Sequence, residues 1–306
     1  MKKLLRLLLL IFALVVILII ALGRPSISPE KLKVDYANEA SKFIEINSMP
    51  VHYRDEGKGP VIVLVHGTAA SLHTWDDWTE KLKKNFRVIR MDIPAFGLTG
   101  PHPQHDYSVG AYSDFLATFL DELSVERFHL AGNSLGGYIS WYYAAKHPVQ
   151  VDRLILLDPS GWPTTGKSPW IFQLARTPVL NWIVKWVTPE SIIHKNLNEV
   201  YHDDGKVNGA LVKRYHDMAL RKGNRDAFIA RAKTPFEDHT SLLKDIKSET
   251  LIIWGAEDTW IDPDLGSKFE AAIPNTTLKI MELVGHVPME ESPMESVRLV
   301  EDFLNN

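Results

Sequence analysis

The stretch Gly132-Asn133-Ser134-Leu135-Gly136 constrains the fold of this chain more than any other part of the sequence. Val125 to Ala131, before it, predicts a β-strand, and Gly137 to Lys146, after it, predicts the opening of a helix. A serine flanked by glycines between a strand and a helix is typical of a turn too tight for larger side chains. Such a turn lifts the serine hydroxyl clear of the sheet. Ser134 is therefore the candidate nucleophile.

Two further polar residues follow Ser134, each just after a predicted strand. Asp258 comes just after the strand-like run Thr250 to Trp254, and His286 comes just after the run Thr277 to Leu283. Open α/β sheets build their sites at the carboxyl ends of strands. We therefore predict a triad in which Ser134 attacks, His286 transfers the proton and Asp258 orients the imidazole.

The acid is the least determined member of this triad. Asp158 also ends a predicted strand, Arg153 to Leu157, and Glu257 and Asp262 lie beside Asp258 in the sequence. We predict Asp258 as the acid, with these three residues as alternatives.

A third predicted strand supplies the expected oxyanion hole. Val61 to Val65 is an apolar run that opens into His66-Gly67-Thr68. The backbone N–H groups of Thr68 and Leu135 are predicted to stabilise a developing oxyanion. His66 is expected to hold this loop in place rather than to act as a base.

These features resemble the α/β-hydrolase superfamily, and within it the branch of cap-bearing esterases, lipases and carbon–carbon bond hydrolases. The matching signatures occur in family order over residues 61 to 290: His66-Gly67, Asp92 to Gly97, Gly132 to Gly137, Trp254 to Asp258, and Gly285 to Pro288. Ala95 departs from the pattern, which usually has glycine there. The resemblance implies a mostly parallel central sheet flanked by helices, a helical cap insertion, and an acyl-enzyme mechanism that needs no metal or cofactor.

The resemblance favours a carboxylic ester, as a small molecule or lipid, as the substrate. Haloalkane dehalogenases and epoxide hydrolases of the superfamily carry aspartate in place of Ser134. Carbon–carbon hydrolases commonly carry tryptophan after the catalytic histidine, where this chain has Val287-Pro288, and a glycine-rich oxyanion loop, where it has Thr68 to Ser71. Carbon–carbon hydrolysis therefore remains an alternative, as do peptidase, haloperoxidase-like and acyl-transfer activities. An alternative of another class is a catalytically silent binding protein.

The predicted elements divide the chain into a core and a cap. After a hairpin within residues 43–53, strands alternate with helices and predict a parallel sheet. The strand pattern stops between Gly161 and about Lys244, where the sequence is helical in character. We predict a core of residues 41–160 and 245–306, a cap of residues 161–244, and a connector of residues 24–40. The tryptophan-rich run Trp170 to Val187, interrupted by Pro178, either packs on the core or lines an acyl pocket as a lid.

The first 23 residues predict a membrane anchor. Leu7 to Leu22 is an unbroken run of 16 apolar residues behind Lys2, Lys3 and Arg6. With Leu4 and Leu5 it approaches the ~20 residues that span a bilayer. The basic residues predict a single-pass transmembrane helix with the catalytic domain on the non-cytoplasmic side. The alternative is a cleaved signal peptide and a secreted or periplasmic protein.

Composition excludes several other functions. Beyond residue 23 the chain has 31 basic and 38 acidic side chains and no basic stripe, which argues against a nucleic-acid partner. The chain has no cysteine, so disulfides, thiolate metal sites and a cysteine nucleophile are excluded. The sequence identifies no protein partner.

Overall fold

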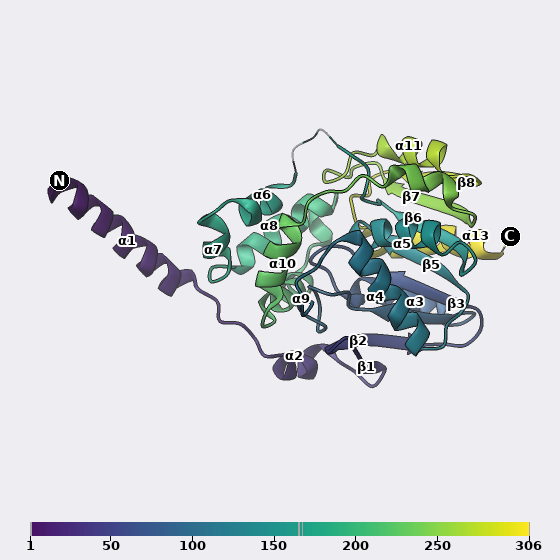
Figure 1. The fold of residues 1–306 in the computed structure, drawn as a ribbon, viewed down its shortest axis with the longest axis horizontal. Helices are drawn as coiled ribbons and strands as arrows, with labels where there is room; N and C mark the ends of the chain where they lie inside the picture. The colour runs from purple at the N-terminus through teal and green to yellow at the C-terminus, as the bar shows by residue number, and fades with distance from the viewer. Residues whose placement is uncertain (1, 165, 167, 306) are drawn as a thin grey trace.

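The computed structural model describes residues 2–164, 166 and 168–305, and these residues form one eight-stranded sheet of order β1-β2-β4-β3-β5-β6-β7-β8 (Figure 1). A hairpin of β1 (Ser41–Ile46) and β2 (Met49–Glu56) lies at one edge and pairs antiparallel with β4. The other six strands run parallel to one another: β3 (Val61–Val65), β4 (Arg87–Met91), β5 (Phe128–Asn133), β6 (Val151–Leu157), β7 (Glu249–Gly255) and β8 (Thr276–Met281). The predicted, mostly parallel α/β-hydrolase sheet is confirmed.

Local sequence explains both parts of the sheet. The hairpin turns at Asn47 and Ser48, whose φ angles of 49° and 65° are those of the turn that best matches strand twist. The parallel strands are nearly continuous runs of valine, isoleucine and leucine because helices bury both of their faces. In β3, for example, Ile62 to Val65 are all buried.

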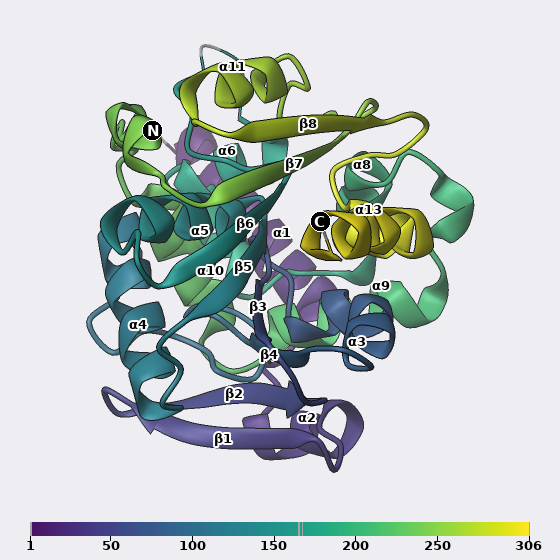
Figure 2. The same ribbon diagram turned by 90° about the vertical axis from the view of Figure 1, so that its right-hand side faces the viewer.

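Helices cover the two faces of the sheet separately (Figure 2). On one face, α4 (Val109–Glu122) and α5 (Leu135–Lys146) pack over a core that contains Phe119 and Ile139. On the other, α3 (Asp76–Leu82) packs against α13 (Pro293–Asn305), and the indole N–H of Trp78 donates to the Ser296 hydroxyl at 2.9 Å. The sheet is thus held rigidly beneath the loops at its strand ends.

Among the described residues between β6 and β7, five α-helices stand beside the core (Figure 1): α6 (Trp170–Arg176), α7 (Leu180–Val184), α8 (Glu190–Val200), α9 (Gly209–Leu220) and α10 (Asn224–Lys233). They occupy the segment where a helical cap was predicted. The Trp170–Val187 run is broken next to Pro178, where Val179 has a φ of 69°. The exact limits of the cap, residues 161 and 244, stay a prediction.

The predicted connector of residues 24–40 contains a helix that sequence reasoning missed. Helix α2 (Pro29–Tyr36) is capped by Ser28, whose hydroxyl accepts from the Lys31 N–H at 3.3 Å. Leu32 is buried, and the Ile27 N–H donates to the Leu220 carbonyl at 2.8 Å. The few apolar residues of this segment thus pack against cap helix α9, and the connector itself stays a prediction.

The apolar N-terminal run forms helix α1 (Lys2–Leu22), which projects away from the body (Figure 1). Leu10 and Phe12 on this helix are each 68% exposed. Across the described residues, however, no helix combines the length and the apolar character that crossing a bilayer requires. The predicted transmembrane helix is therefore not supported.

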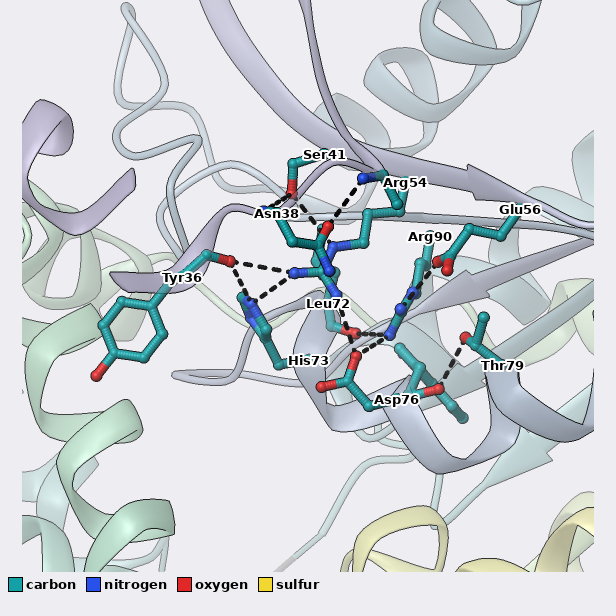
Figure 3. Close-up of polar contacts among 12 residues, drawn as sticks. Tyr36, Asn38, Ser41, Arg54, Glu56, Leu72, His73, Asp76, Thr79 and Arg90 are labelled. Atoms are coloured by element: carbon teal, nitrogen blue, oxygen red, sulfur yellow. Dashed lines mark hydrogen bonds and ion pairs between the residues drawn. The ribbon is translucent and has the colours of Figure 1, made fainter. Parts of the chain in front are cut away.

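A polar network fixes the segment that follows the predicted oxyanion loop (Figure 3). Arg54 on β2 donates to the Asp76 carboxylate at 3.2 Å and to the Tyr36 carbonyl at 3.1 Å. Arg90 on β4 donates to the Leu72 carbonyl at 3.2 Å. The ring of His73 lies among these groups, 3.2 Å from the Arg54 guanidinium. The network ties the 3-10 turn of Leu72–Trp75 to two strands of the sheet.

Because His73 is buried in this network, the stability of the fold is expected to fall in acid. Burial lowers the pKa of His73 from 6.5 to about 4. Between these values the unfolded chain binds a proton that the folded chain does not, so the free energy of unfolding decreases as the pH falls from 6.5 to 4, by up to about 3 kcal/mol for this group. Urea denaturation at pH 7, 5.5 and 4.5 measures the loss. The His73→Gln variant should show a shallower pH dependence, and equal slopes in the two proteins would contradict this account.

Candidate active site

Ser134 sits alone in the turn between β5 and α5. Its φ of 54° and ψ of −115° lie in a region that costs a non-glycine residue about 1–3 kcal/mol. Backbone hydrogen bonds of 3.0 Å hold it there: its N–H donates to the Leu157 carbonyl, and its carbonyl accepts from the N–H groups of Ser160 and Tyr138. The strand reaches Asn133 and the helix starts at Leu135, so the turn is tighter than the sequence pattern predicts.

The glycines around Ser134 are required by backbone contacts. A Cβ atom on Gly132 would lie 2.2 Å from the Gly136 carbonyl oxygen. A Cβ atom on Gly136 would lie 2.1 Å from the Val65 carbonyl oxygen. Any side chain at either position would therefore push β3, β5 and α5 apart.

The structure brings the predicted acid and base together. The His286 Nδ1 donates to the Asp258 Oδ2 at 2.7 Å, and both side chains are buried. The other oxygen of Asp258 accepts from the N–H groups of Trp260 at 2.8 Å and Ile261 at 3.0 Å. With Nδ1 holding the proton, the Nε2 of His286 is the acceptor nitrogen that a serine hydroxyl requires.

Asp158, the alternative acid, is buried beside Asp258 but does not hydrogen-bond to His286. Its Oδ1 accepts from the Gly255 N–H at 2.9 Å, and its Oδ2 is a buried oxygen without a hydrogen-bond partner among the described residues. Burial, and then the charge of Asp258, raise the pKa of Asp158 well above its usual range. Two carboxyls this close do not both ionise, so Asp158 is the neutral one. Glu257 and Asp262, the other candidates, are exposed.

The same three side chains lie close enough together to be candidate metal ligands. Within the described chain, ligand atoms of Asp158, Asp258 and His286 all lie within 4.8 Å of one another. However, the 2.7 Å between His286 and Asp258 suits a shared proton, because a metal at about 2.0–2.6 Å from each ligand holds them farther apart. The cluster is therefore better described as hydrogen-bonded carboxyls and imidazole.

The loop after β3 lies directly against the nucleophile. A Cβ atom on Gly67 would be 3.2 Å from the Ser134 Cβ. The Nε2 of His66 accepts from the Ile93 N–H, and its Nδ1 donates to the Gly67 carbonyl at 2.8 Å. Burial lowers the pKa of His66, so the ring is neutral and holds the loop in place. In the described chain, the N–H groups of Thr68 and Leu135 donate to no protein acceptor, as an oxyanion hole requires.

Two residues that sequence reasoning missed hold the His286 loop. The Asn133 amide donates to the His286 carbonyl at 2.9 Å. The buried carboxylate of Glu291 accepts from the Gly285 N–H at 2.6 Å, and from the N–H groups of His202 and Asp203 in the cap segment at 2.9 and 2.8 Å. In the sequence, Glu291 looks like one of several solvated acids at a helix start, so no local pattern marks it.

Replacing Glu291 with glutamine is expected to lower kcat by about 10- to 100-fold. The glutamine amide would face N–H donors that now share a carboxylate, leaving a buried donor unsatisfied at about 1–3 kcal/mol and shifting the His286 loop. Turnover and thermal unfolding measure the two effects. Glu295→Gln, on an exposed glutamate of the following helix, is the matched control and should change neither. Equal behaviour of the two variants would exclude this role for Glu291.

Two cavities border the site. The first, the apolar cavity, has a volume of about 80 Å³ and lies between cap helices and the oxyanion loop, with Ala69, Ala70 and Phe96 in its wall. The second, the arginine cavity, has a volume of about 770 Å³. Its wall includes Leu135 and the candidate acid Asp258, the neighbouring Trp260, and the two cap arginines Arg176 and Arg231. The Trp260 ring lies 5.7 Å from the His286 ring. A substrate held at Ser134 would thus have an apolar and a cationic side.

Comparison with known proteins agrees with the fold. Residues 60–181 match the family described as alpha/beta hydrolase fold. A 2-hydroxy-6-oxononadienedioate/2-hydroxy-6-oxononatrienedioate hydrolase of Pseudomonas putida is 29% identical over 281 residues, 87% of this chain and 97% of the relative. A 2-hydroxy-6-oxo-2,4-heptadienoate hydrolase of Pseudomonas putida is 28% identical over 87% of this chain and 96% of its own. Residues 60–181 thus match the α/β-hydrolase family, and the sheet of the described chain has the fold of that family.

Solved structures share the fold and are named for a wider range of reactions. A membrane phospholipase A described as a bacterial virulence factor superposes with a TM-score of 0.75 and 26% identity, covering 100% of this chain and 98% of that one. A meta-cleavage product hydrolase of Pseudomonas fluorescens superposes with a TM-score of 0.75 at 24% identity, covering 86% and 97%, and shows the fold alone. A hydrolase activity is supported. The preference for an ester is not, since the curated relatives are named for dienoate substrates.

Proposed function

We propose that this chain is a serine hydrolase in which Ser134, His286 and Asp258 form a catalytic triad. The observation that carries the proposal is the 2.7 Å hydrogen bond from His286 Nδ1 to Asp258. Asn133, which precedes Ser134 in the strained strand-to-helix turn, donates to the His286 carbonyl at 2.9 Å and so brings this pair to the serine. An imidazole oriented by a carboxylate near a serine hydroxyl is the arrangement that acyl transfer uses.

The steps follow from this arrangement. The Ser134 Oγ bonds to a carbonyl carbon while the His286 Nε2 takes its proton, and Asp258 stabilises the imidazolium. The oxyanion accepts hydrogen bonds from the N–H groups of Thr68 and Leu135, each typically worth about 3–4 kcal/mol. The bond to the leaving group then breaks as His286 returns the proton to it. Water then gives a proton to His286 and bonds to the acyl carbon, and the bond to the Ser134 Oγ breaks as Oγ takes that proton back from His286.

The first candidate reaction is carbon–carbon bond hydrolysis. Curated relatives at 28–29% identity, aligned over 87% of this chain, are named as hydrolases of 2-hydroxy-6-oxo dienoic acids. In this chain, Ser134 would attack the oxo carbon, and the neighbouring carbon would leave with the electron pair and take the proton from His286. The conjugated dienoate makes that carbon an acceptable leaving group.

The second candidate is hydrolysis of a carboxylic ester. It is favoured by the apolar cavity beside the oxyanion loop, which suits an alkyl acyl chain. It is also favoured by the 26% identical membrane phospholipase A, which matches the full length of this chain. Val287 follows His286 here, where carbon–carbon hydrolases commonly have tryptophan.

A substrate panel separates the two reactions. The full-length chain is assayed with a 2-hydroxy-6-oxo dienoate, followed by loss of its absorbance, and with p-nitrophenyl esters from acetate to palmitate. A kcat/KM at least 100-fold higher for one class assigns the reaction, and the optimal ester length gives the size of the acyl pocket. A fluorophosphonate probe tests the serine separately. No cleavage and no labelling would favour a catalytically silent binding protein.

The location of the protein stays a prediction from its N-terminal sequence. Basic residues before the apolar run favour a catalytic domain on the non-cytoplasmic side, either held by residues 1–23 or released after their cleavage. A reporter fused after Asn306 tests the side, and N-terminal sequencing of the protein from cells tests the cleavage. A reporter accessible only from the cytoplasm would overturn the predicted orientation.

A further inference from the structure

Two asparagines interrupt the mostly apolar wall of the apolar cavity. Much of this wall consists of aliphatic and aromatic side chains of the cap, such as Ile171, Val187 and Phe228. Asn196 of α8 and Asn224 of α10 line the same cavity. The side-chain oxygen of each asparagine is buried and has no hydrogen-bond partner within the described chain. Two unpaired acceptors therefore border a cavity of only about 80 Å³.

The hydrogen bonds of Asn224 show that its oxygen is the atom left without a partner. Its amide nitrogen donates to the Gly97 carbonyl at 3.1 Å and to the Met218 carbonyl at 2.8 Å. These two bonds use both amide hydrogens and fix the orientation of the amide, because an amide oxygen in that place could not donate. The residue is 4% exposed, so bulk solvent does not supply the missing donor.

The other polar side chains on the cavity wall donate elsewhere. The Thr188 hydroxyl donates to the Val184 carbonyl at 2.9 Å. The Arg225 guanidinium donates to the Arg24 carbonyl and to the Ser26 hydroxyl, both at 2.9 Å. An acceptor that is buried without a donor destabilises a fold. The two asparagine oxygens are therefore best explained by a ligand that brings a donor into the cavity.

The composition of the wall indicates the chemical class of that donor. A carboxylate or phosphate dianion has no proton to give to an amide oxygen. A single water, whose share of liquid volume is about 30 Å³, would leave more than half of the cavity empty. A hydroxyl on an aliphatic chain satisfies both parts of the wall, because the hydroxyl donates to an amide oxygen while the chain packs on the apolar side chains.

The cavity lies beside the place that the acyl part of a substrate would occupy. Its wall includes Ala69 and Ala70, which follow Thr68 of the predicted oxyanion hole. In the same loop, a Cβ atom on Gly67 would be 3.2 Å from the Ser134 Cβ. An acyl group on the Ser134 oxygen, with its carbonyl oxygen at the Thr68 N–H, would therefore have its chain next to this cavity.

We propose that Asn224, together with Asn196, binds a hydroxyl group carried by the acyl part of the substrate. The inference rests on the proposed function, because it assumes that Ser134 is the nucleophile. A site that hydrogen-bonds a substrate hydroxyl rejects the analogue that lacks it, because the buried polar groups of the site are then left unpaired. The enzyme thus prefers hydroxyacyl groups to alkyl groups of the same size.

Two pairs of p-nitrophenyl esters test this preference: 3-hydroxybutyrate against 3-methylbutyrate, and 6-hydroxyhexanoate against heptanoate. Within each pair a methyl group replaces the hydroxyl at equal size, and the two pairs place the hydroxyl at two depths. The full-length chain should show a kcat/KM about 10- to 100-fold higher for the hydroxy ester of at least one pair. Equal values within both pairs, or higher values for the alkyl esters, would overturn the inference.

Asn196→Leu and Asn224→Leu remove the acceptors at nearly constant size, and each should reduce the preference for the hydroxy ester by about tenfold or more. Because the Asn224 amide also holds the carbonyls of Gly97 and Met218, thermal unfolding is measured for both variants, and Asn196→Leu decides if Asn224→Leu does not fold. Asn198→Leu is the matched control. The Asn198 oxygen, on the same helix α8, is also buried without a partner in the described chain, but it does not belong to the described wall of this cavity. This control should keep the preference.

The outcomes separate this inference from the proposed function. If esters are cleaved and the fluorophosphonate labels Ser134, but the asparagine variants keep the preference or the control loses it equally, the inference is overturned and the proposed function stands. If no ester is cleaved, calorimetry on the Ser134→Ala protein with methyl 6-hydroxyhexanoate and methyl heptanoate decides. Tighter binding of the hydroxy ester that Asn196→Leu removes supports the hydroxyl site, and equal or absent binding refutes it.

Discussion

Replacing Ser134 with alanine is expected to lower kcat by a factor of about 10⁵ to 10⁶ on whichever substrate the chain cleaves. The substitution removes the atom that forms the acyl-enzyme, and no other hydroxyl takes its place in the strained turn. The residual rate comes from the oxyanion hole and substrate binding alone. Steady-state turnover, together with labelling by a fluorophosphonate, measures the effect, and the label should vanish with the activity.

Ser160 provides the control for this prediction. Its hydroxyl lies close to the nucleophile and donates to the Ser134 carbonyl at 3.1 Å, yet it is not in the turn. Ser160→Ala should retain labelling and lose less than about tenfold in kcat, since one modest hydrogen bond is removed. Full activity of the Ser134→Ala variant would refute the triad. So would a Ser160→Ala variant that is inactive and in which the probe no longer labels Ser134.

Replacing Asp258 with asparagine is expected to lower kcat by about 10⁴-fold with the fold intact. The carboxylate now accepts the Nδ1 proton of His286, and an amide N–H at that position would force the proton to the other ring nitrogen. His286 could then no longer accept the proton of Ser134. A thermal unfolding curve run alongside the turnover assay shows whether the protein is still folded.

Asp158→Asn is the matched substitution, because it makes the same change in a neighbouring carboxyl. Since the pKa of Asp158 is raised well above its usual range, this group is already neutral and asparagine resembles it in charge and shape. The loss in kcat should stay below about tenfold. The opposite result, a large loss for Asp158→Asn and a small one for Asp258→Asn, would move the acid to the end of β6.

Several features could be predicted because they depend on residues close together in the chain. The turn around Ser134 needs glycine two residues away on each side, since Gly132 and Gly136 contact backbone atoms directly. The parallel sheet follows from runs of apolar residues separated by helical segments. The helix break beside Pro178 is local as well. Such features are visible in a single sequence.

Three other predictions failed or stayed incomplete, and one of them depended on a contact between distant parts of the chain. Helix α2 was missed because its stability comes from packing Leu32 against the cap rather than from its own polar sequence. The transmembrane helix is not supported by the described residues. The preference for an ester over a carbon–carbon bond rested on Val287 and the loop after Gly67, whereas the named relatives favour the second chemistry.

The sequence by itself therefore determined the sheet, the strained serine and the order of the candidate triad, because short-range sterics and apolar periodicity specify them. Only the tertiary structure decided which carboxyl meets His286 and which is neutral, since burial and the distance between two acids 100 residues apart set their charges. It also decided that Asn133 holds a loop 153 residues away. Likewise, helices α6 and α10 had to pack before Arg176 and Arg231 could face one cavity. Contacts of this kind come from the folded chain as a whole, and no local pattern encodes them.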